Sequence, residues 1–282
     1  MNTFTSYDGV QLAHSSIGEG LPVVCVPGGP GRSVAYLEDL GGLQRDRTLL
    51  LLDPRATGHS EVPSDPVTLR FDRMADDLEA MRQHLKLDRL DLLAHSAGCL
   101  VAQAWASRFP ERVGHLILVT PSDRLQGGNR EDVPAIRESF AGEPWYAEAA
   151  EAQAALEDAP PSQRAGLERL ARPFAYGRWD ERAQEHAAGA DHQCSKRALL
   201  GFGAGVEDLD LGQLLAGLTA VDAPVTVIGG DRDGMTGVAS CHLVAQSFPN
   251  STKVVLEGAG HYPWVDQPEA FADAVRAGLR TL

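Results

Sequence analysis

The first half of the chain alternates short apolar runs with segments of helical periodicity, and this alternation restricts the fold more than any other feature of the sequence. Parallel strands joined by crossover helices produce this order. One intervening segment, 72–85, places Met74, Leu78, Met81 and Leu85 on one stripe, which predicts a helix with a buried face. The apolar runs themselves predict strands over 3–7, 10–16, 23–26, 48–52, 90–94 and 115–119.

The second half of the chain begins with a change in amino-acid composition. Residues 122–218 are rich in Ala, Glu, Arg and Gln and show no strand pattern, so we expect several short helices there. Alternation then resumes, with strands expected over 224–228 and 252–256 and helices over 238–248 and 268–282. A helical block between strands of one sheet predicts the α/β fold class, with a mostly parallel central sheet flanked by helices. The expected division is a core of residues 1–121 and 219–282 with an inserted helical cap, 122–218.

Net charge, hydrophobicity and cysteine content limit the binding partners and the cellular compartment that we expect for this chain. The chain has 25 basic against 39 acidic residues, a formal charge of −14, which argues against nucleic acid or an anionic membrane surface as a partner. No run approaches the roughly 18 apolar residues of a membrane span, and the first residues lack the basic start and apolar stretch of a signal peptide. Its 4 cysteines are scattered without a C-x-x-C pair, which favours reduced, buried thiols. We therefore expect a cytoplasmic protein.

The segment 94–98, Ala-His-Ser-Ala-Gly, follows an apolar strand pattern and precedes a helical one. A serine between small residues at a strand-to-helix turn is the pattern of a nucleophile elbow. The turn is too tight for large side chains two residues before and two after the serine, and Ala94 and Gly98 meet that requirement. The pattern therefore predicts that Ser96 is an exposed nucleophile at the start of a helix.

A serine hydroxyl needs an imidazole to take its proton and a carboxylate to orient that imidazole. Asp233 follows the strand expected at 224–228, and His261 follows the strand expected at 252–256. The carboxyl ends of parallel strands meet at one edge of a sheet, so Ser96, Asp233 and His261 are expected to face the same crevice. Their order along the chain predicts a catalytic triad.

Other assignments stay open at this point. Asp231 or Asp123 could replace Asp233 as the acid, since each also lies near a strand end. His95 adjoins the serine, but its side chain should point away from it and form hydrogen bonds within the elbow. No His, Cys, Asp or Glu cluster has metal-ligand spacing, so neither a metal nor a cofactor is expected.

The tetrahedral intermediate would need N–H donors for its oxyanion. The backbone N–H of Ala97, directly after the nucleophile, is one candidate. The loop after the strand at 23–26 reads Pro-Gly-Gly-Pro-Gly, and consecutive glycines allow the backbone to approach a substrate closely. We expect Gly29 of this loop to supply the second N–H.

With these residues in view, the chain resembles the α/β-hydrolase superfamily and, within it, the prolyl aminopeptidase-like group, peptidase family S33. Residues 27–31, Pro-Gly-Gly-Pro-Gly, resemble the His-Gly-Gly-Pro-Gly pattern of that group, with Pro27 in place of the histidine. Residues 53–60 are similar to its Asp-x-Arg-Gly-x-Gly-x-Ser pattern, with Ala56 in place of a glycine. The elbow differs from the peptidase form, Gly-Gly-Ser-Trp-Gly, and is closer to that of esterases.

The resemblance implies a serine hydrolase that uses an acyl-enzyme and hydrolyses a small amide or peptide substrate in the manner of a prolyl aminopeptidase. Its partner would then be a small molecule or short peptide. Aminopeptidases of this group hold the free amine with carboxylates of the cap, which Asp180 or Glu181 could provide here; both could equally be the acidic start of a cap helix. Trp145, Tyr146 and Trp179 could form an apolar roof. A small-molecule carboxylesterase is the alternative, and a non-catalytic ligand receptor on the same fold is a second one.

Overall fold

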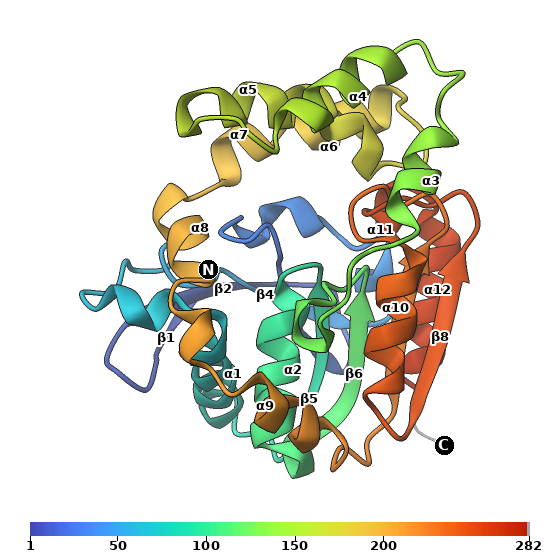
Figure 1. Ribbon diagram of the computed structural model, residues 1–282. Coiled ribbons are helices and arrows are strands. Elements are labelled where there is room, and N and C mark those ends of the chain that lie inside the picture. Colours follow the sequence, from blue (N-terminus) through green and yellow to red (C-terminus); the bar gives the residue numbers. More distant parts are fainter. Residues whose placement is uncertain (281–282) are drawn as a thin grey trace.

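The computed structural model describes residues 1–280, which form an eight-stranded sheet with helices on both faces (Figure 1). The order across the sheet is β1-β2-β4-β3-β5-β6-β7-β8. Strands β1, β2 and β4 pair antiparallel, and all pairs from β4 to β8 are parallel. The strands are β1 (Asn2–Thr5), β2 (Gln11–Ile17), β3 (Pro22–Val26), β4 (Thr48–Leu52), β5 (Leu90–His95), β6 (Val113–Val119), β7 (Val225–Gly230) and β8 (Ser251–Leu256).

The strand order reverses at β3, which lies between β4 on one side and β5 on the other. The loops that leave β3 and β5 therefore run to opposite sides and open a crevice at the carboxyl ends of these strands. The Pro-Gly-Gly-Pro-Gly loop follows β3, and the turn that contains Ser96 follows β5. The topology thus brings the two segments together, although they are some 65 residues apart in sequence.

Alternate residues of the parallel strands point to opposite faces of the sheet. Val24 and Val26 belong to the core shared with α1 (Phe71–His84), α2 (Gly98–Arg108) and α10 (Gly237–Gln246). Their neighbours Val23 and Cys25 belong to the core on the other face, which is covered by α12 (Pro268–Gly278). Both faces of the central strands are buried, which explains why these strands read as continuous apolar runs.

The α/β fold class expected from the sequence is confirmed. Each of the eight predicted strands is present, with ends displaced by at most two residues. The helix predicted over 72–85 is α1, and Met74, Leu78 and Met81 of its stripe are buried as expected. The closing helix predicted to residue 282 ends at Gly278, and residues 281–282 lie outside the described part of the chain.

Residues 122–218 contain helices and no strand. In Figure 1, α4–α7 form a layer across the carboxyl-terminal edge of the sheet, whereas α9 lies beside α2 of the core. The division into a core and a cap with ends at 122 and 218 stays a prediction. The helices are α3 (Val133–Glu138), α4 (Tyr146–Ala155), α5 (Pro161–Ala171), α6 (Glu181–Ala188), α7 (Ala190–Gln193), α8 (Lys196–Phe202) and α9 (Leu211–Leu218).

Two further expectations concern the thiols and membranes. All four cysteines are free, and three are buried as expected, but Cys194 is exposed because it lies in the turn between α7 and α8. Among residues 1–280, no helix has the length and apolar character needed to span a membrane.

Candidate active site

The turn after β5 has the geometry of a nucleophile elbow. Ser96 has a φ of 54°, in the left-handed region that non-glycine residues rarely adopt. Its N–H donates to the Val119 carbonyl at 2.9 Å, which fixes the turn to β6. A Cβ atom at Gly98 would lie 2.4 Å from the Pro27 carbonyl oxygen. Gly98 is therefore required because the loop after β3 passes directly against the elbow.

A chain of hydrogen bonds joins the three residues predicted as a triad. Ser96 Oγ lies 2.9 Å from His261 Nε2, and His261 Nδ1 lies 2.9 Å from Asp233 Oδ2. Because the carboxylate can only accept, Nδ1 carries the proton and Nε2 is free to accept the serine proton. The structure brings Ser96, Asp233 and His261 together from the ends of β5, β7 and β8.

Asp233 is held as an anion in a fully buried position. Burial alone would raise the pKa of this carboxyl, but the adjacent His261 and several hydrogen bonds outweigh burial and hold the pKa below its usual value. Thr236 donates through both its hydroxyl, at 2.6 Å, and its backbone N–H, at 3.1 Å. The two rival acids lie elsewhere: Asp231 accepts from the Gly258 N–H at 2.7 Å, and Asp123 pairs with Arg130 at 3.5 Å.

The two predicted oxyanion donors have unused N–H groups. Within residues 1–280, neither the Gly29 nor the Ala97 N–H donates to a protein acceptor, and both residues line the cavity beside Ser96. The preceding Gly28 N–H donates instead to the Tyr36 hydroxyl at 2.6 Å. Gly29 has a φ of 122°, which only glycine adopts without strain. The loop therefore leaves the Gly29 N–H available to a ligand.

His95 is buried beneath the elbow and forms hydrogen bonds there, as expected. Its Nδ1 lies 2.7 Å from the Tyr36 hydroxyl, and its Nε2 lies 2.9 Å from the His261 carbonyl oxygen. Burial, together with the charge of His261, lowers the pKa of His95 well below its ordinary value. A neutral ring with its proton on Nε2 satisfies both contacts.

A cavity of about 290 Å³ lies next to Ser96. Besides Ser96, His261, Gly29 and Ala97 it is lined by aromatic, small and basic side chains. These include Arg32, Tyr36, Leu100, Ser122, Arg124, Arg130, Phe202, Met235, Thr236 and Tyr262.

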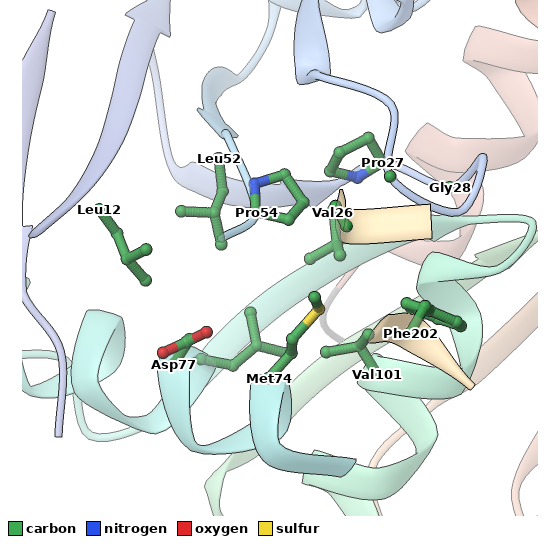
Figure 2. Close-up of a pocket in the computed structure, with 13 residues that line it drawn as sticks. Leu12, Val26, Pro27, Gly28, Leu52, Pro54, Met74, Asp77, Val101 and Phe202 are labelled. Atoms are coloured by element: carbon green, nitrogen blue, oxygen red, sulfur yellow. The ribbon is translucent and has the colours of Figure 1, made fainter. Parts of the chain in front are cut away.

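A second, smaller cavity lies beneath the loop after β3 (Figure 2). Its volume is about 20 Å³, and Leu12, Val26, Met74 and other apolar side chains line it. Phe202 lines both this cavity and the one beside Ser96. The Phe202 ring is thus a shared wall between the two spaces.

Comparison with known proteins agrees with this arrangement. A family model described as alpha/beta hydrolase fold matches residues 22–268. The chain belongs to the α/β-hydrolase fold family. It is a hydrolase of that family, and its resemblance to the prolyl aminopeptidase-like group is confirmed by the similarities that follow.

Among the relatives of this α/β hydrolase, the proline iminopeptidase of Heyndrickxia coagulans is 38% identical over 104 residues, which are 37% of this chain and 36% of that protein. The 3-oxoadipate enol-lactonase 2 of Acinetobacter baylyi is 26% identical over 99% of this chain and 96% of that protein. A proline iminopeptidase-related protein from Thermus thermophilus has a similar structure, with a TM-score of 0.71, 28% identity and coverage of 99% and 96% of the two chains.

The five cap residues predicted to contact substrate do not line the cavity of this α/β hydrolase beside Ser96. Trp145 and Tyr146 pack around Phe174 within the cap, with ring centroids 5.4 and 6.1 Å away. Trp179 packs against Tyr176 at 5.3 Å. Trp145 and Tyr146 thus contribute to a small apolar cluster within the helical layer, whereas Trp179 packs against the core on the α12 face of the sheet.

The acidic pair of the cap is engaged elsewhere. Asp180 precedes α6 and accepts from the Ala183 N–H at 3.0 Å, as an N-cap residue does. It also pairs with Arg178 at 2.8 Å. Glu181 is exposed in the first turn of α6. This placement matches the alternative interpretation of the two carboxylates as the acidic start of a cap helix.

Sequence reasoning missed several residues of the α/β-hydrolase site. Arg32 and Tyr36 follow the glycine-rich loop, and Tyr262 follows the predicted catalytic histidine. His186 of α6 also contributes, since its Nε2 lies 2.9 Å from the Tyr36 carbonyl oxygen. The position of Arg32 directly after the glycine-rich loop was the one available signal, whereas the His186 contact spans 150 residues and leaves no local pattern.

Proposed function

We propose that this α/β hydrolase is a cofactor-independent serine hydrolase that cleaves small carboxylic esters or lactones through an acyl-enzyme. The observation that carries the proposal is the hydrogen-bonded chain from Ser96 through His261 to Asp233. Two unused N–H groups, of Gly29 and Ala97, beside the serine support it. The cavity of about 290 Å³ suits a small substrate.

In the proposed reaction, Ser96 Oγ attacks the substrate carbonyl while His261 Nε2 takes the hydroxyl proton. The carbonyl oxygen becomes an oxyanion that accepts from the Gly29 and Ala97 N–H groups. His261 then gives its proton to the leaving oxygen, and the ester bond breaks. Asp233 stabilises the imidazolium without taking its proton. Water repeats the sequence on the acyl-enzyme and releases the acid.

The catalytic role of Ser96 is tested with 4-nitrophenyl acetate and a fluorophosphonate probe. We expect the wild-type protein to turn over many equivalents of ester and to gain one covalent label. Ser96→Ala should lose the label and at least about 10³-fold in kcat. Ser139→Ala, which removes an exposed hydroxyl from the end of α3, is the matched control. Turnover that persists in Ser96→Ala would refute the assignment, and stoichiometric binding without turnover would favour a ligand receptor.

A prolyl aminopeptidase-like activity is the second candidate, and the similarity to proline iminopeptidase favours it. The two candidates differ in their response to a free amine. Anilides and aryl esters of proline and alanine, each with a free and an acetylated amine, separate them. Cleavage that depends on the free amine would establish the aminopeptidase, and ester cleavage without that dependence would establish the esterase.

A further inference from the structure

The cavity beside Ser96 carries an excess of positive charge. Arg32, Arg124 and Arg130 line it, and none of its lining residues within the described chain is Asp or Glu. The whole chain has a formal charge of −14, so the sign of the cavity opposes that of the protein. A reversal of sign confined to a cleft points to a ligand of negative charge.

Arg32 is the central member of this group, since only 4% of its surface is exposed. Its Nε donates to Gln193 Oε1 at 2.8 Å, and its Nη1 donates to the Tyr262 hydroxyl at 3.3 Å. The Tyr36 ring lies 4.1 Å from its Cζ. Its Nη2 has no hydrogen-bond partner, and no carboxylate of residues 1–280 pairs with it. The guanidinium is therefore buried among neutral groups alone.

A buried charge without a counter-charge is unfavourable, because the protein does not replace the water that it loses. The two hydrogen bonds and the aromatic face offset only part of that cost. They also fix the orientation of the guanidinium while leaving Nη2 unused. A planar guanidinium held in this way matches a carboxylate, which can accept from two of its N–H groups at once.

The other two arginines extend the positive field to solvent. Arg124 and Arg130 are exposed, and no ion pair of Arg124 is found within residues 1–280. Arg130 pairs with Asp123 at 3.5 Å, which offsets part of its charge, and its Nη1 donates to the Met235 carbonyl oxygen at 3.3 Å. Such a field attracts an anion and repels a protonated amine. Asp180, which would have held an amine, is instead engaged at the start of α6.

We propose that the substrate is a small ester or lactone that also carries a carboxylate, and that Arg32 binds this carboxylate while Ser96 attacks the carbonyl. This inference rests on the proposed serine hydrolase function. Arg124 and Arg130 guide the anion into the cavity, whose volume of about 290 Å³ limits the substrate to a compact molecule. Arg32 thereby determines specificity and takes no part in proton transfer.

The kinetic test compares the 4-nitrophenyl monoester of glutaric acid with its uncharged methyl ester. We expect the wild-type protein to have a higher kcat/KM for the anionic ester, and Arg32→Gln to lower that value by about 10- to 100-fold. The uncharged ester should lose less in the same variant, so that the ratio of the two kcat/KM values falls by about tenfold. Thermal unfolding of Arg32→Gln shows separately that the variant is folded. Arg32→Lys should lose less, because it keeps the charge. Arg112→Gln, at an exposed ion pair with Glu111, is the control.

A binding measurement separates this proposal from the proposed function. Ser96→Ala protein is titrated by calorimetry with monomethyl glutarate and, separately, with dimethyl glutarate. Tighter binding of the monoanion, lost in the additional Arg32→Gln variant, supports the carboxylate site even if no ester is hydrolysed. Equal binding of the two compounds, or an equal loss for both kinetic substrates in Arg32→Gln, would overturn it and leave Arg32 as a structural residue of the loop.

Discussion

Tyr36→Phe should weaken both folding and catalysis, because one hydroxyl serves two buried partners. The hydroxyl accepts from the Gly28 N–H at 2.6 Å and donates to His95 Nδ1 at 2.7 Å. Phenylalanine keeps the ring, and with it the contact to Arg32. Only the two hydrogen bonds are lost, and both remaining polar groups become buried without a partner.

Each such group costs about 1–3 kcal/mol, so we expect the two together to lower the free energy of unfolding by about 2–6 kcal/mol. For a chain of this size that loss corresponds to a decrease in Tm of roughly 3–10 °C. We expect kcat to fall by about tenfold with KM little changed, since the Gly28 backbone orients Gly29 and the oxyanion contact forms only in the transition state.

The assays are chemical denaturation, thermal unfolding and ester hydrolysis. Tyr146→Phe is the matched control, because the Tyr146 hydroxyl donates to Glu138 at an exposed position and should contribute little. A Tm within about 2 °C of the wild type in Tyr36→Phe would refute the reasoning, since it would mean that water or a shift of the loop satisfies both groups.

Three other substitutions test separate parts of the structure. Lys86 has a φ of 55° just after α1 and is exposed, so Lys86→Gly should raise the free energy of unfolding by about 1 kcal/mol, seen as a higher denaturation midpoint. Phe202→Ala should join the two cavities, raise kcat/KM for hexanoate relative to acetate esters by about tenfold and cost about 3 kcal/mol of stability. Burial raises the pKa of Asp266 to about 6, despite hydrogen bonds from the Gly177 and Gly260 N–H groups, so the folded state holds the extra proton between pH 4 and 6. The free energy of unfolding of the wild-type protein should therefore fall by up to about 3 kcal/mol relative to that of Asp266→Asn as pH rises through that window. Denaturation of both proteins at pH 4 and at pH 7 measures this change, and an equal difference in stability at the two pH values would contradict it.

The sequence predicted the residues whose placement depends on local pattern and on the general geometry of parallel sheets. Ser96, Asp233 and His261 each follow a strand of the same sheet, and strand ends converge whatever the details of packing. Gly29 was predicted because consecutive glycines mark a close backbone approach. These expectations need only the strands and their order.

The remaining residues depend on contacts between distant segments, which leave no periodic signal. The side that a cap helix turns toward the core depends on its neighbours, so Trp145 and Tyr146 could not be placed from their own helix. Ala56 shows a second limit of prediction from the sequence, which concerns backbone conformation. It has a φ of 58° where the related pattern has glycine, because the buried Arg55 beside it is fixed by Asp77 and other acceptors. Tertiary contacts there override a local preference.

His95 connects the loop after β3 with the loop that carries His261, through a series of hydrogen bonds that all donate in the same direction. The Gly28 N–H donates to Tyr36, Tyr36 donates to His95 Nδ1, and His95 Nε2 donates to the His261 carbonyl. Because the Tyr36 hydroxyl accepts from Gly28, it donates its own proton to His95 Nδ1. His95 Nδ1 must then be unprotonated, so His95 is neutral and carries its proton on Nε2. Because burial keeps the pKa of His95 low, the series persists at neutral pH. The predicted oxyanion loop and the loop that carries His261 are thus held at a fixed separation around the serine, which is the preorganisation that an oxyanion site needs.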